Sequence, residues 1–154
     1  MSGTAVRETL SVLAVLAGLA FVGVEIRQNN SLARGQARQD LADATEEWIQ
    51  TLTQDPEYYE VWDRAWIRCE ELEGTEARRA SLMMLGLLRR QENVFFQYRE
   101  GLVDESALAS YGAGQAAPHF QCPRFRELWR GQRSTTYDPE FVDFFDNSME
   151  LRAP

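Results

Sequence analysis

The sequence predicts an all-α protein with one N-terminal transmembrane helix that extends into a small bundle of about four to five further helices. Three observations predict this class. Residues 10–26 form an almost unbroken apolar run, later segments place apolar residues at helical spacing, and no segment shows the strict alternation of a half-buried strand. About two thirds of the chain lies beyond the juxtamembrane region, so a separate domain with its own core is expected.

The apolar run reads LSVLAVLAGLAFVGVEI and is closed by Arg27, with no charged residue before Glu25. A helix rises about 1.5 Å per residue and the hydrocarbon core is about 30 Å thick, so roughly 17–25 apolar residues can cross it. We therefore predict an uncleaved membrane anchor at the short end of this range. Its main lipid-facing side chains are expected to be Leu10, Leu13, Leu16, Leu19, Phe21, Val24 and Ile26.

Two alternatives compete with the anchor. A cleaved signal peptide needs a basic start and a small-residue cleavage site, but Glu8 offsets Arg7 and the small-residue sites lie inside the apolar run. A buried core helix usually keeps a polar stripe, whereas this run holds only Ser11 and glycines besides its apolar residues. The anchor is the preferred interpretation.

Arginines flanking the run predict its orientation. Arg27, Arg34 and Arg38 follow it, whereas Arg7 alone precedes it. Positive residues stay on the cytoplasmic side, so the domain is expected in the cytoplasm, with the chain's N-terminus on the other side of the membrane. The same three arginines are expected to contact anionic lipid headgroups, at about 1 kcal/mol each.

The rest of the chain divides at helix signals. We expect four segments in order: an N-terminal extramembrane tail at 1–9, the transmembrane helix at 10–26, a juxtamembrane helix at 27–54 and an acidic helical domain at 55–154. Asp55-Pro56 and Asp104 are expected to cap new helices, and Gly101 to end one. The domain's helices are expected at 56 to about 69, 75–100, 105–111, 124–132 and 139–151, with a loop at 112–123.

Charge and cysteine content limit the function classes. The net charge is −8, and every basic residue is Arg. Residues 1–40 hold four Arg against three acids, while the remainder holds twelve Arg against 21 acids. A domain this acidic is not expected to bind nucleic acid. Cys69 and Cys122 are distant in sequence and form no C-x-x-C pair, which is compatible with free thiols in a reducing cytoplasm.

No motif predicts catalysis, a cofactor or a metal site. His119 and Cys122 lie three residues apart and could form an activated nucleophile, but no orienting group or oxyanion hole is recognisable. One histidine is too few for a helical di-iron site. Gly112-Ala-Gly114 resembles a dinucleotide motif in letters only, because no strand precedes it and Pro118 follows. A non-enzymatic protein without a cofactor is expected.

Polar residues interrupt the apolar stripe of the helix expected at 75–100. A buried acid there would need an Arg partner, which predicts a tie between helices, with a ligand pocket as the alternative. The residues concerned are Arg89, Glu92, Asn93 and Tyr98.

Two strings, Glu25-Ile-Arg-Gln-Asn29 and Glu92-Asn-x-x-x-Gln97-Tyr98, resemble a family of small uncharacterised bacterial proteins with an N-terminal transmembrane helix and a helical soluble domain. The resemblance covers nearly the whole chain and implies the same architecture, anchored in a bacterial inner membrane, but no activity. The Gly/Ala-rich segment 112–117 departs from it, since a Trp-containing helix would be expected there.

These observations favour a single-pass, non-enzymatic protein whose domain binds a protein partner, or is an accessory or structural subunit of a membrane complex. Ala14 and Gly18 form one small-xxx-small step through which two copies could pack as a homo-oligomer. The alternative is a tethered domain that binds a small molecule or lipid in a pocket near Glu92 and Tyr98.

Overall fold

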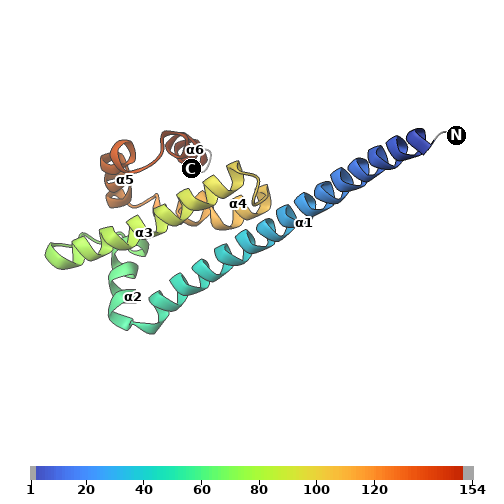
Figure 1. Cartoon of the computed structure of the whole chain (residues 1–154). Helices are drawn as coiled ribbons and strands as arrows, with labels where there is room; N and C mark the ends of the chain where they lie inside the picture. The colour runs from blue at the N-terminus through green and yellow to red at the C-terminus, as the bar shows by residue number, and fades with distance from the viewer. Residues whose placement is uncertain (1–2, 151–154) are drawn as a thin grey trace. The chain divides into compact units, whose positions relative to one another are not determined.

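A computed structural model describes residues 3–150, and the chain divides into two units, residues 1–36 and residues 37–154. The first helix, α1 (Gly3–Gln54), runs without a break through the boundary between them (Figure 1). The described residues contain helices, turns and no strand, so the predicted all-α class is confirmed.

The first unit is the apolar part of α1. Among the described residues this is the one helix long and apolar enough to cross a membrane, with a mean hydropathy of 2.0 over its most apolar window and none of that window buried. Leu16, Leu19 and Phe21 each expose more than half of their surface. A long apolar helix of this kind is compatible with the predicted membrane anchor.

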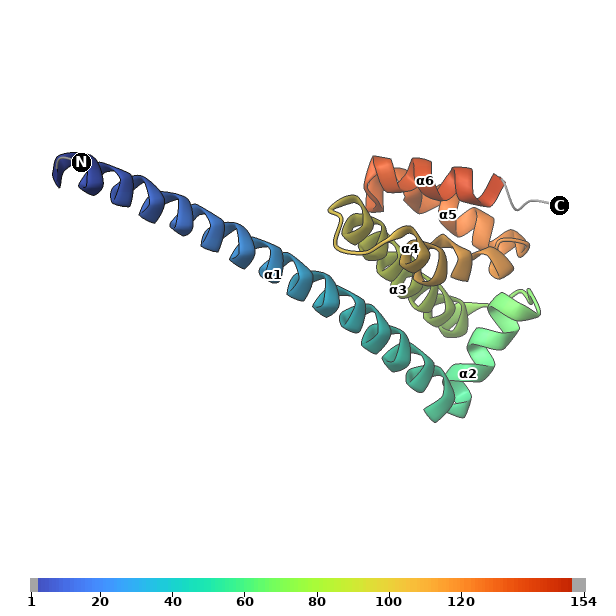
Figure 2. The ribbon, with the colours of Figure 1, turned by 90° about the vertical axis from the view of Figure 1, so that its right-hand side faces the viewer.

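The second unit contains the remaining helices. α2 (Pro56–Trp62) continues into a π-helical turn, η1 (Asp63–Ile67), and is followed by the long α3 (Gly74–Arg99) and the short α4 (Glu105–Tyr111). Two 3₁₀ turns, η2 (Ala113–Gln115) and η3 (Ala117–His119), precede α5 (Pro123–Thr136) and α6 (Pro139–Glu150). Within this unit, α5 and α6 lie side by side over α3 (Figures 1 and 2).

The helix starts follow the predicted capping chemistry. The Asp55 carboxylate accepts the backbone N–H groups of Glu57 and Tyr58 at 3.0 and 3.1 Å, and Asp104 accepts that of Ala107 at 3.0 Å. Such caps satisfy N–H groups that have no partner within the helix. Gly101, which follows α3, has a φ of 69°, a conformation that glycine adopts without steric cost.

The helix expected from residue 56 to about 69 is shorter than predicted. After Trp62 the hydrogen bonds widen to a π turn, and the Arg68 N–H reaches the Asp63 carbonyl at 2.9 Å. Cys69 then has a positive φ of 55°, which a non-glycine residue rarely adopts. The chain therefore leaves the helical path at Cys69 and turns toward the start of α5.

The main core of the second unit is aromatic. Trp66, Phe125, Trp129, Phe141 and Phe145 are each at most 2% exposed, and Trp129 and Phe145 have ring centroids 4.4 Å apart. A smaller cluster packs residues 37–41 of α1 against α3 and α4. Its buried members are Ala37, Leu41, Val94, Val103, Ala107 and Leu108.

A disulfide joins Cys69 to Cys122 across 53 positions of sequence. The expectation of free thiols is therefore wrong for this structure. Sequence separation gave no indication of the pairing, because the turn at Cys69 and the start of α5 come together through tertiary packing. In that packing the ring centroids of Trp66 and Phe125 are 6.2 Å apart.

Candidate functional site

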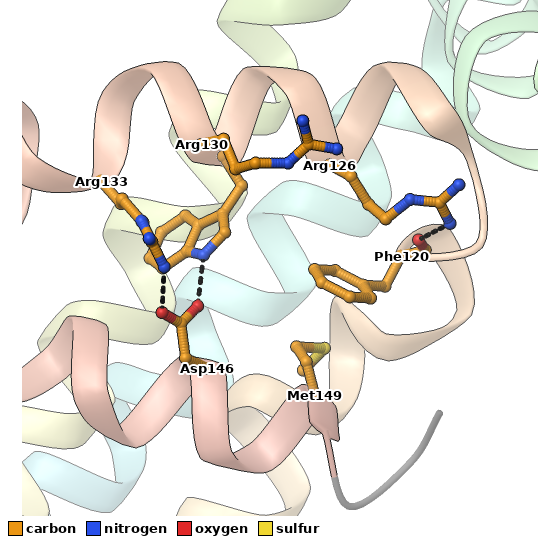
Figure 3. Close-up of a pocket in the computed structure, with 7 residues that line it drawn as sticks. Phe120, Arg126, Arg130, Arg133, Asp146 and Met149 are labelled. Carbon is orange, nitrogen blue, oxygen red and sulfur yellow. Dashed lines mark hydrogen bonds and ion pairs between the residues drawn. The ribbon is translucent and has the colours of Figure 1, made fainter. Parts of the chain in front are cut away.

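A cleft with a volume of about 280 Å³ lies between α5 and α6. Its lining combines three arginines with apolar side chains and one carboxylate (Figure 3). The residues are Phe120, Arg126, Trp129, Arg130, Arg133, Asp146 and Met149.

Helical periodicity brings the arginines to the cleft. Arg126, Arg130 and Arg133 stand at positions i, i+4 and i+7 of α5, which share one face of a helix. Trp129 is 2% exposed and anchors this part of α5 in the core, while Met149 of α6 is equally buried. The cleft is therefore built on two packed helices rather than on loops.

One end of the cleft is closed by internal polar contacts. Asp146 accepts a hydrogen bond from Trp129 Nε1 at 2.6 Å and forms an ion pair with Arg133 (Figure 3). A buried indole N–H usually has such a partner. Both oxygens of Asp146 are used in these contacts, so this end is neutralised within the domain.

The other end carries positive charge that the domain does not neutralise. One guanidinium nitrogen of Arg126 donates hydrogen bonds to the backbone carbonyls of Phe120 and Gln121, at 3.1 and 3.0 Å. Arg130 has no polar partner among the described residues. These contacts leave two guanidinium groups without a carboxylate. The cleft residues together carry a net charge of about +2, on a domain that is otherwise strongly acidic.

The polar residues predicted on α3 separate into two groups. Glu92 is 7% exposed, and its carboxylate accepts the backbone N–H of Asp138 at 2.8 Å and a bond from Arg89 at 2.6 Å. Asn93 is exposed, and Tyr98 is 40% exposed. Arg89 and Glu92 therefore take part in a tie between helices, and the other two residues lie away from it.

The His119–Cys122 pair is engaged in structural contacts. His119 is 8% exposed, and its Nδ1 lies 3.0 Å from the backbone carbonyl of Trp66. Burial lowers the pKa of this histidine, so the neutral ring is favoured, with Nδ1–H as donor. Cys122 is bonded to Cys69 in this structure, and its side chain is completely buried. In the part of the chain that the structure describes, no group of three or more His, Cys, Asp or Glu is arranged to hold a metal ion.

The flanking arginines also differ from one another. Arg27 and Arg34 are exposed and have no polar partner within residues 3–150, whereas Arg38 lies 3.4 Å from the carboxylate of Asp104 and donates to Ser106 at 3.3 Å. Arg38 therefore contacts the domain, which leaves Arg27 and Arg34 as the arginines that remain free for headgroups.

No protein family matches the chain, and no curated protein or solved structure is significantly similar to it. The function must therefore be argued from the residues themselves. The arginine cleft was not predicted from the sequence, although the spacing of positions 126, 130 and 133 was a readable signal.

Proposed function

We propose that the chain is a single-pass membrane protein in which residues 10–26 form the anchor, and that its acidic helical domain binds a protein partner as an accessory subunit of a membrane complex. The observation that carries the anchor is the most apolar stretch of α1, none of which is buried in the described chain. Exposing this surface to water would be costly, at about 25 cal/mol per Å² of apolar area. A bilayer removes that cost.

Charge and surface composition support partner binding by the domain. Beyond residue 40 the chain carries nine more acids than arginines, which favours a partner with a basic surface. Ile49, Tyr59, Ile67 and Leu82 each expose half or more of their surface and supply apolar contact area. A second copy of the chain is the other candidate partner, through Ala14 and Gly18.

The arginine bias supports placing the domain on the cytoplasmic side of the proposed bacterial inner membrane. The Cys69–Cys122 disulfide points in the other direction, because disulfides persist in oxidising compartments and are usually transient in the cytoplasm. Our proposal therefore requires that both thiols are reduced in the resting cell. Alkylation with a membrane-impermeant maleimide tests this in intact and in permeabilised cells. If the domain is cytoplasmic, its cysteines react only after the cells are permeabilised. If the thiols are reduced, they react without prior treatment with a reductant.

Extraction of the tagged full-length protein in mild detergent tests the partner. We expect a companion of fixed stoichiometry to co-migrate in size-exclusion chromatography and to be identified by mass spectrometry. Replacing residues 10–26 with an unrelated transmembrane sequence is the matched control. A companion that remains is bound by the domain; a lone monomer in both forms would contradict the proposal.

A further inference from the structure

We propose that the arginine-lined cleft between α5 and α6 binds a small amphiphilic anion, a carboxylate carried on a compact apolar body. The proposal concerns the domain alone and goes beyond the membrane anchoring and partner binding proposed above. It predicts that the anionic head lies between Arg126 and Arg130, and that the apolar body lies against Phe120 and Met149.

The charges determine where the head binds. The Arg133 end is already neutralised by Asp146, whose oxygens would also repel an incoming anion. Arg130 has no polar partner in the described chain, and Arg126 uses only one of its three guanidinium nitrogens. Figure 3 shows their side chains extended along the same edge of the cleft. Like charges four residues apart destabilise a helix, and a carboxylate between them would offset that repulsion.

The guanidinium groups also favour a carboxylate by shape. A planar guanidinium donates two parallel N–H bonds to the two oxygens of a carboxylate, whereas the compact ammonium group of a lysine cannot. Arg126 is half-buried and already oriented by the carbonyls of Phe120 and Gln121. Its remaining nitrogens are therefore positioned before a ligand arrives, which reduces the entropy lost on binding.

The apolar lining and the volume limit the body of the ligand. Phe120 is partly exposed and offers a ring face, next to the sulfur-containing side chain of Met149 (Figure 3). Ligand sites for drug-sized molecules usually span about 300–1,000 Å³, and this cleft lies just below that range at about 280 Å³. A single fused aromatic ring system or a short acyl chain fits; a complete two-chain lipid would place only part of itself in the cleft.

The test uses full-length protein in nanodiscs of neutral lipid, titrated by calorimetry, with empty nanodiscs as background. The probe is 2-naphthoate, its neutral analogue is 2-naphthamide, and inorganic phosphate represents an anion without an apolar body. We expect saturable binding of naphthoate, with at least tenfold weaker binding of both comparison compounds. Arg130→Glu should weaken naphthoate binding at least tenfold.

Arg78→Glu is the matched control, because Arg78 is exposed on α3 and has no polar partner in the described chain. It should leave naphthoate binding unchanged, and both variants should keep the wild-type circular dichroism spectrum. Equal loss in the two variants, equal binding of the amide or of phosphate, or no binding of naphthoate would each overturn the proposal. Repeating the titration in nanodiscs with phosphatidylglycerol tests the choice of a carboxylate: competition by this phosphodiester lipid would overturn it, and unchanged naphthoate binding supports a soluble carboxylate.

Discussion

The buried carboxylate of Glu92 accepts the backbone N–H of Asp138 at 2.8 Å, across 46 positions of sequence. This bond fixes the middle of α3 to the residue that caps α6, since the Asp138 side chain itself accepts the N–H of Glu140 at 2.9 Å. Arg89 holds the second oxygen of Glu92 and lies 5.0 Å from the ring centre of Tyr137. One carboxylate thus positions the α5–α6 connection.

Removing this carboxylate should destabilise the domain. We expect Glu92→Ala to lower the free energy of unfolding by about 2–3 kcal/mol, because it leaves a backbone donor without its charged acceptor. Glu92→Gln keeps an acceptor oxygen and should cost less. Chemical denaturation of the full-length protein in detergent measures both, and Glu71→Ala, at an exposed position, serves as the control. Equal losses at positions 92 and 71 would contradict the role of the tie.

Unlike the Glu92 carboxylate, the neighbouring Gln91 amide is buried without hydrogen bonds in the described chain. It is completely buried, and neither its amide oxygen nor its nitrogen has a hydrogen-bond partner among residues 3–150. Replacing an unsatisfied amide with an apolar side chain of similar shape is neutral or stabilising, so Gln91→Met should raise the free energy of unfolding by about 1–2 kcal/mol. Gln121→Met, at an exposed position, should change it by less than about 0.5 kcal/mol. A clear loss of stability in Gln91→Met would show that the amide is satisfied in solution.

The disulfide should contribute measurably to stability. A cross-link that closes a loop of 53 residues is worth about 4 kcal/mol if it acts only on the entropy of the unfolded chain, and observed contributions are usually about 2–4 kcal/mol. Dithiothreitol should therefore shift the denaturation midpoint of wild-type protein downward. The double variant Cys69→Ala/Cys122→Ala should be insensitive to the reductant. An unchanged wild-type midpoint would mean that the bond adds nothing to stability.

Acid should weaken the domain through His119. Burial lowers the pKa of this histidine in the folded state, whereas in the unfolded chain it has its ordinary value of about 6.5. Below pH 6.5 the unfolded chain therefore binds the proton more readily, and stability is lost as the pH falls toward the lowered pKa. Because His119 is the single histidine of the chain, its ring proton signals in an NMR titration report that pKa directly. A pKa at or above 6.5 would contradict the buried, neutral ring.

The sequence predicted the elements with strong local signals. Asp55 and Asp104 begin helices where their spacing to following residues indicated, and α3 differs from its predicted range by one residue at each end. The apolar residues at helical spacing on α3 are buried, as their spacing indicated; they are Ala80, Met83, Met84, Leu87 and Leu88. These features depend on residues within one or two turns of each other.

The features that were missed depend on tertiary packing. The π turn after Trp62 and the positive φ of Cys69 follow from the approach of α5, which no local pattern encodes. The arginine cleft needs Asp146 and Met149 of α6 beside the arginines of α5, and a periodicity analysis treats these as two unrelated faces. Short-range patterns therefore predicted the helices, while the candidate site required the structure.

The most direct test of the membrane anchor is alkaline carbonate extraction of cell membranes that contain the full-length protein. The wild type should remain in the pellet, and so should Ile49→Arg, which adds a charge to an exposed apolar position outside the anchor. Leu16→Arg/Leu19→Arg should appear in the soluble fraction, since each central Arg costs about 2.5–3.5 kcal/mol in the bilayer. Release of the wild-type protein by carbonate would contradict a transmembrane anchor at residues 10–26.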